Sequence, residues 1–141
     1  MDYISNIRLS VPKAAPGEII RQKLLNDALS GHKRLTYIQA GAGYGKTALL
    51  AQIANTNENT VWLTLDGESD VFTFANNLCA AVRLRFPACD FTISEFIPFE
   101  SRNNFITILA DALISALEKL ADDLMIILDD FHTVTDQQIN Q

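Results

Sequence analysis

The 141-residue sequence has few of the features that mark secreted, metal-binding or membrane proteins. It contains two cysteines, Cys79 and Cys89, without metal-ligand spacing or neighbouring histidines, so we expect reduced thiols and no site at either. No apolar run approaches the roughly 18 residues of a membrane span. Residues 1–6 do not resemble the start of a signal peptide. These absences predict a cytoplasmic protein with no membrane partner.

Positive charge is also scarce. Lys and Arg number 11 against 17 Asp and Glu, which gives a formal net charge of −6. No expected helix carries a basic stripe, and the short group at 32–34 is best explained as a solvated helix end. Because neutralisation of phosphates supplies most of the affinity for nucleic acids, we expect no direct nucleic-acid binding by this segment.

One glycine-rich stretch, residues 40–47, lies between an apolar run at 35–39 and a helical pattern at 46–54. The order strand, glycine loop, helix is typical of a phosphate-binding loop (Walker A), where free backbone N–H groups and the helix dipole bind phosphates. A merely structural glycine turn would not need Lys46 and Thr47 together. We expect Lys46 at the β- and γ-phosphates and Thr47 at Mg²⁺. The expected cofactor-binding residues of this stretch are Gly41, Ala42, Gly43, Tyr44, Gly45, Lys46, Thr47 and Ala48.

The rest of the chain alternates between helical and strand patterns. Residues 1–17 are expected to form an extended arm, and a connection at 88–102 has no regular pattern. The expected elements are a helix from Glu18 to about Gly31, a strand at 60–65, a helix at 71–86, and a helix with the apolar stripe Phe105, Ile108, Leu109, Ala112, Leu113, Ala116, Leu117 and Leu120. This stripe should be core on the face of a sheet. The alternation predicts an α/β fold with a parallel sheet and helices on both faces.

Residues 124–130 run from apolar residues into the acidic pair Asp129 and Asp130. A buried parallel strand that delivers a carboxylate toward Mg²⁺ beside the phosphate loop is the Walker B arrangement. Asp129 is the metal candidate because it directly follows the apolar run. Asp130 either orients the attacking water as a catalytic residue or is an exposed turn residue. His132 is expected to be structural.

Several segments together resemble the nucleotide-binding region of the MalT-type STAND ATPases, which are large transcriptional regulators of the LuxR family. The resemblance lies in residues 35–52 with Tyr44 between the glycines, in 19–25, in 62–66 with Phe74, and in 128–132. It implies a three-layer P-loop NTPase fold (ASCE/STAND type) over residues 18–141 that stops after the Walker B strand. It also implies ATP or ADP with Mg²⁺ as cofactors, Asp130 as the hydrolysis carboxylate and Arg21 near the base or sugar. From the residues alone, Arg21 would be a solvent-facing charge.

The resemblance implies that further strands, sensor residues, an effector-binding part and a DNA-binding part follow in the parent family. Three hypotheses therefore stay open. The chain is the nucleotide-binding segment of a signalling ATPase, with little or no hydrolysis by itself. Alternatively, it binds no nucleotide productively and acts by self-association or by pairing with an intact homologous regulator. The third hypothesis is another P-loop ATPase, such as an AAA+ protein.

Overall fold

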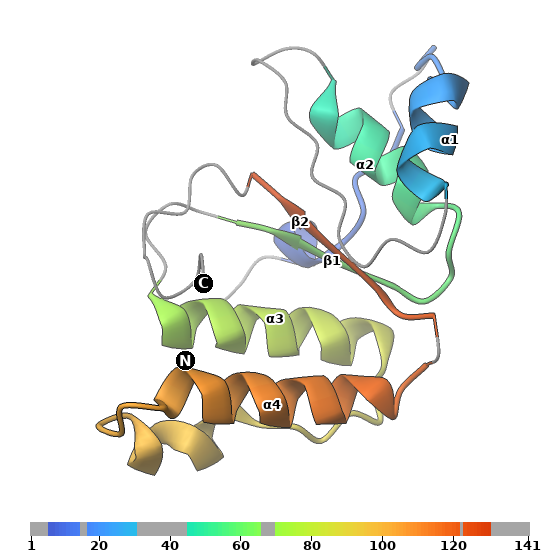
Figure 1. Cartoon of the computed structure of the whole chain (residues 1–141). Helices are drawn as coiled ribbons and strands as arrows, with labels where there is room; N and C mark the ends of the chain where they lie inside the picture. The colour runs from blue at the N-terminus through green and yellow to red at the C-terminus, as the bar shows by residue number, and fades with distance from the viewer. Residues whose placement is uncertain (1–5, 15–16, 31–44, 66–69, 122, 131–141) are drawn as a thin grey trace.

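The computed structural model describes residues 6–14, 17–30, 45–65, 70–121 and 123–130 (Figure 1). Within these ranges the chain forms two 3-10 helices, four α-helices and two strands. In chain order they are η1 (Asn6–Leu9), α1 (Gln22–Leu29), α2 (Lys46–Ala54), β1 (Thr60–Thr64), α3 (Val71–Arg85), η2 (Ile93–Phe99), α4 (Phe105–Glu118) and β2 (Met125–Asp129). None of the helices in these ranges has the length and apolar character needed to cross a bilayer. The strand expected at 35–39 lies outside the described residues.

The two strands pair in parallel, with Thr60 opposite Met125 and Thr64 opposite Asp129. Parallel neighbours require a long crossover, which here contains α3, η2 and α4. The pairing places the carboxyl ends of both strands at the same edge of the sheet. A helical and strand-containing chain with a parallel sheet agrees with the predicted α/β class.

Helices cover both faces of this small sheet. Figure 1 shows α1 and α2 on one side of the strands and α3 with α4 on the other. Side chains alternate along β1, because successive residues of a strand point to opposite faces. Val61 and Leu63 pack with Leu78 and Val82 of α3. Trp62 packs on the opposite face, in a cluster that contains Ile127 of β2 and the α2 residues Leu49, Ile53 and Ala54.

The apolar stripe of α4 faces inward, as its spacing predicts. All eight stripe residues are buried or half-buried, whereas the off-stripe Ile114 is 53% exposed. The amino-terminal part of the stripe packs against α3 and η2 through Phe105 and Leu109. The carboxyl-terminal part, with Leu117 and Leu120, packs against the cluster that contains β1.

The first α-helix begins later than its apolar spacing predicts, at Gln22 instead of Glu18. Arg21 has φ −88° and ψ 72°, which is not helical, and it forms the amino-terminal cap position of α1. The backbone of Ile19 and Arg21 is hydrogen-bonded to the side chain of Gln52 on α2. This tertiary contact holds the residues before α1 out of the helix.

Two other segments are more ordered than predicted. Part of the expected amino-terminal arm forms η1, and Leu9 at its end is buried in the cluster of β1 and α3. The connection at 88–102 contains η2, where the rings of Phe91 and Phe96 stack with centroids 5.4 Å apart. The sequence of neither segment has the apolar periodicity of an α-helix or a strand. Each segment is held by a few single side chains and not by a repeating apolar face.

Candidate functional site

The amino end of α2 lies at the position where the sequence predicts phosphate binding. Gly45 precedes the helix in a left-handed conformation, with φ 76° and ψ 30°, and its carbonyl accepts a hydrogen bond from Leu49 N at 3.0 Å. Lys46, Thr47 and Ala48 form the first turn, which contains no acidic residue. The N–H groups of a first helical turn have no partner within the helix, and the helix dipole is positive there. This end of α2 therefore favours an anion.

Thr47 meets the end of β2. Its hydroxyl donates a hydrogen bond to Asp129 Oδ2 at 2.9 Å, across 82 residues of sequence. Asp129 is only 5% exposed, and its other oxygen, Oδ1, accepts from the backbone N–H of Asp130 at 3.0 Å. Both of its carboxylate oxygens are thus hydrogen-bonded, as a buried polar group requires. The structure brings together the two residues that the sequence predicts as metal ligands.

Asp130 follows in an unusual backbone conformation. Its φ is +61°, and it is the one residue other than glycine with a positive φ in the described part of the chain. The side chain is half-buried. Asp tolerates the left-handed region better than most residues because its short polar side chain can bond locally. The chain therefore changes direction at Asp130, directly after the buried Asp129.

Arg21 also reaches the amino end of α2. A Cβ atom added to Gly45 would lie 3.1 Å from Arg21 Nη2 and 3.5 Å from Cζ, so the guanidinium lies against this glycine. The backbone N–H of Arg21 points to Gln52 Oε1 at 3.4 Å, and Gln52 Nε2 donates to the carbonyl of Ile19 at 3.1 Å. Sequence analysis did not single out Gln52, since a glutamine on a helix surface is usually solvated.

Arg8 is a second arginine at the carboxyl edge of the sheet. Its Nε and Nη2 donate to the carbonyl of Thr64 at 3.2 and 3.0 Å. Thr64 is the register partner of Asp129, and Leu65 N donates to the carbonyl of Asp129 at 2.9 Å. Arg8 therefore anchors η1 to the end of β1. Sequence analysis missed it because an isolated arginine in a loop carries no periodic signal.

Four of the predicted phosphate-loop residues, Gly41, Ala42, Gly43 and Tyr44, lie outside the described residues, as does His132. The described members Gly45, Lys46 and Ala48 are half-buried, and Thr47 is exposed.

The two cysteines are free thiols, as predicted. Burial in α3 raises the pKa of Cys79 to about 11, so this thiol is protonated at neutral pH. No group of three or more His, Cys, Asp or Glu side chains suited to a metal ion occurs among the described residues. Neither cysteine takes part in the site.

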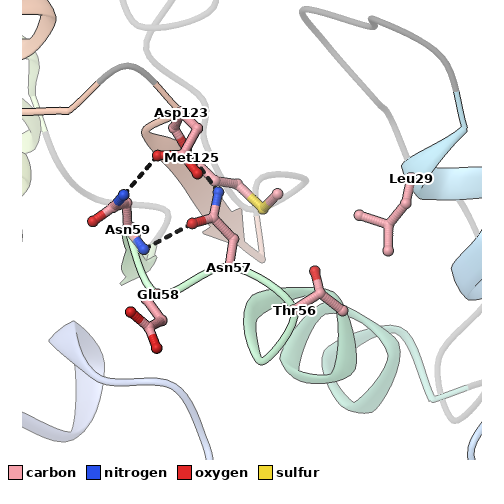
Figure 2. Close-up of a pocket in the computed structure, with 7 residues that line it drawn as sticks. All are labelled: Leu29, Thr56, Asn57, Glu58, Asn59, Asp123 and Met125. Atoms are coloured by element: carbon pink, nitrogen blue, oxygen red, sulfur yellow. Dashed lines mark hydrogen bonds between the residues drawn. The ribbon is translucent and has the colours of Figure 1, made fainter.

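A separate pocket of about 460 Å³ opens at the other edge of the sheet, beside the start of β2 (Figure 2). Its polar side chains bond to one another. Asn57 Nδ2 donates to the carbonyl of Asp123 at 2.7 Å, and Asn59 Nδ2 donates to Asp123 Oδ1 at 2.6 Å. Asn59 N also donates to Asn57 Oδ1 at 2.8 Å. These contacts join the turn before β1 to Asp123, two residues before β2, and they explain the polar lining without a ligand.

Comparison with known proteins gives relatives among bacterial transcriptional regulators. The chain is 33% identical over 138 residues to the HTH-type transcriptional regulator MalT of Yersinia pestis (strain Pestoides F). It has the same identity to the MalT of Yersinia pseudotuberculosis (strain YPIII) and of Yersinia enterocolitica serotype O:8, over 95% of this chain and 15% of each relative. No protein-family model matches.

This similarity covers 95% of the chain. It bears out the resemblance drawn from the phosphate loop and the acidic pair at the end of β2. The chain is therefore a sequence relative of the MalT-type transcriptional regulators that spans 15% of the length of these relatives.

Proposed function

We propose that this chain binds a purine nucleoside triphosphate or diphosphate together with Mg²⁺, as the nucleotide-binding segment of a MalT-like signalling regulator with a P-loop NTPase fold. The observation that carries the proposal is the hydrogen bond between Thr47 and Asp129. It joins the first turn of α2 to the carboxyl end of β2, and ligands of α/β sheets bind at that edge.

The oxygen atoms of these two residues fit a shared magnesium ion. Mg²⁺ prefers octahedral oxygen ligands at 2.0–2.1 Å, so two neighbouring ligand atoms are about 2.9 Å apart. Thr47 Oγ1 and Asp129 Oδ2 are 2.9 Å apart. A hydroxyl and a carboxylate are also the donor types that Mg²⁺ takes from proteins in phosphate sites. When bound, the ion would neutralise phosphate charge.

The start of α2 supports binding of the phosphates. Lys46 supplies a cation in the first turn, and the left-handed Gly45 turns the chain so that the first N–H groups of the helix are presented together. In this proposal Gly41, Ala42, Gly43, Tyr44 and Ala48 complete the loop around the phosphates.

Asp130 is the candidate for positioning the attacking water in hydrolysis. It directly follows the buried Asp129, and its positive φ turns the chain at the carboxyl edge of the sheet. We propose that hydrolysis by this chain is slow or absent, since a carboxylate that positions water supplies only part of the stabilisation that phosphoryl transfer needs.

The proposal is tested by calorimetric titration of the chain with ATP and ADP in the presence of Mg²⁺. Lys46→Ala should weaken binding by about a hundredfold or more, because it removes a charge-assisted contact to the phosphates. Lys119→Ala is the matched control, since Lys119 is an exposed lysine at the end of α4 and its loss changes the net charge equally. Equal affinities in the two variants would contradict the proposal.

Association with another chain is a second candidate, favoured by one observation. In the described residues β2 has a strand neighbour on one side only, and its Ile126 is 36% exposed. A strand edge of this kind can pair with another chain. A folded chain that binds no nucleotide and sediments as a dimer would favour this function. A monomer with magnesium-dependent nucleotide affinity would exclude it.

A further inference from the structure

Thr64, the last residue of β1, lies next to Asp129, the proposed metal ligand. The two residues are register partners, and neighbouring strands of a sheet are about 4.8 Å apart. Alternate side chains of a strand share a face, so Thr64 is on the face of Trp62, and Asp129 is on the face of Ile127. Trp62 and Ile127 both pack in the cluster that contains α2 residues. The side chains of Thr64 and Asp129 are therefore on the same face of the sheet.

Two contacts from different parts of the chain fix Thr64. The indole N–H of Trp62, which is only 1% exposed, donates to Thr64 Oγ1 at 2.9 Å. The guanidinium of Arg8 donates to the Thr64 carbonyl at 3.2 and 3.0 Å. Because Leu65 N donates to the carbonyl of Asp129, the backbone groups of the preceding residue point to the other edge of β1. Arg8 thus holds the backbone of Thr64 from that edge, while Trp62 holds its hydroxyl.

The Thr64 hydroxyl keeps hydrogen-bonding capacity after this contact. A hydroxyl has two lone pairs and one proton, and an indole N–H is a donor only, so Trp62 occupies one lone pair. Among the described residues the contact with Trp62 is the one hydrogen bond of this hydroxyl. The side chain is half-buried, at the edge of the sheet where Asp129 ends β2. One lone pair and one proton are therefore available to a group beside Asp129.

Magnesium ions supply groups of this kind. Mg²⁺ keeps several water ligands when it is bound by only one or two protein groups, and surrounding side chains hydrogen-bond to such ligands. The proposed site offers two protein groups, Thr47 Oγ1 and Asp129 Oδ2. The side chain opposite Asp129 on β1 is that of Thr64. A hydroxyl there can bond to a water ligand and adds no charge beside the carboxylates of Asp129 and Asp130.

We propose that Thr64 is a further residue of the metal site, whose hydroxyl, oriented by Trp62, bonds to a water ligand of the magnesium ion. The inference rests on the proposed nucleotide and magnesium site and deepens it. Trp62 is a positioning residue, because it acts on that water only through the hydroxyl of Thr64. Arg8 supports the same position through the backbone.

The test measures ATP dissociation constants of the full chain without and with Mg²⁺ by calorimetry, and their ratio gives the magnesium dependence. Thr64→Val keeps the shape of the side chain and removes the hydroxyl. Its ratio should fall about tenfold, the lower end of the effect of removing an outer-shell partner, while affinity without Mg²⁺ stays the same. Thr64→Ser keeps a hydroxyl and should retain most of the ratio.

Thr60→Val is the matched control. Thr60 begins the same strand and has its side chain on the same face, at the opposite edge of the sheet. Its hydroxyl bonds to the carbonyls of Ala54 and Asn57 at 3.3 and 2.7 Å. The loss of these bonds should lower the stability of the chain to urea and leave the magnesium ratio unchanged. The control thus separates a loss of stability from a loss of magnesium binding.

A double-mutant cycle tests the role of Trp62. Trp62→Phe keeps an aromatic ring and removes the N–H that orients the hydroxyl, so the ratio should fall by a smaller factor than in Thr64→Val. Added to Thr64→Val, the same change should leave the ratio where it is, because no hydroxyl is left to orient.

The only tryptophan of the chain gives a second readout. Because the indole N–H of Trp62 donates to the Thr64 hydroxyl, its fluorescence emission reports on that bond. Addition of Mg²⁺ and ATP should change the emission of the unmodified chain and of Thr60→Val. In Thr64→Val the change should be largely lost.

The outcomes separate this inference from the proposed function. A magnesium ratio in Thr64→Val as large as in the unmodified chain would overturn the role of Thr64 alone. An equal fall of the ratio in Thr60→Val would assign the effect to stability and also overturn it. A further fall when Trp62→Phe is added to Thr64→Val would remove Trp62 from the account. Failure of the unmodified chain to bind nucleotide would overturn both proposals.

Discussion

At the scale of single residues, the site depends on two left-handed backbone positions. Gly45 opens α2 with φ 76°, and Asp130 follows β2 with φ 61°. Glycine adopts this region without cost, whereas a residue with a side chain is strained there. The two positions lie on either side of the contact between Thr47 and Asp129. Backbone strain at Asp130 is thus located directly beside the proposed metal ligand.

Substitutions at Asp130 should show this strain in the stability of the fold. Asp130→Ala should lower the free energy of unfolding by about 1 kcal/mol relative to Asp130→Gly, because alanine is disfavoured at positive φ and glycine is not. Asp130→Asn should remain close to the unmodified chain, since asparagine tolerates the same conformation. Urea unfolding measures all three. Equal stability of the alanine and glycine variants would show that the turn relaxes.

At the scale of elements, α3 is fixed at its start by a side-chain cap. The carboxylate of Asp70 accepts a hydrogen bond from Thr73 N at 2.7 Å. This backbone hydrogen bond, with a second one from the Thr73 hydroxyl, lowers the pKa of Asp70 from its usual 3.8. Because the charged form is the better acceptor, the cap stabilises α3 most when Asp70 is ionised.

The cap makes part of the stability depend on pH. A lowered pKa in the folded state means that the contribution is complete above about pH 4 and is lost as the pH falls through the folded-state pKa. Asp70→Ala should therefore cost about 1 kcal/mol at pH 7, and less in acid. Asp111→Ala, at an exposed position within α4, is the control and should cost nothing. A loss for Asp70→Ala that is as large in acid as at pH 7 would contradict the assignment.

The elements also show what sequence periodicity can and cannot predict. The bounds of α2 are those predicted, and β1 and α3 each end one residue earlier than predicted, because apolar spacing and flanking turn residues define them locally. The start of α1 was wrong by four residues, since it depends on Gln52, which is distant in sequence. The two 3-10 helices were missed because single buried side chains hold them, which leaves no periodic pattern in the sequence.

At the scale of the whole molecule, the parallel pairing of β1 and β2 brings residues from the two ends of the chain to one edge. The meeting of Thr47 and Asp129 was predictable from two motifs and the rule that parallel strands share a carboxyl edge. The roles of Arg8 and Arg21 at this edge depend on the path of the chain before α1. No local pattern encodes that path, so sequence analysis missed Arg8 and considered Arg21 only through the resemblance.

In the proposed site, Thr47 and Asp129 hold Mg²⁺ beside a bound nucleotide. The most direct measurement is the ratio of ATP dissociation constants without and with Mg²⁺, for the unmodified chain, for Asp129→Asn and for the exposed control Asp111→Asn. We predict a large ratio in the unmodified chain and in the control. In Asp129→Asn the ratio should fall toward one, while affinity without Mg²⁺ changes little, because the amide keeps the shape of the side chain and loses its charge. An undiminished ratio in Asp129→Asn would contradict the account.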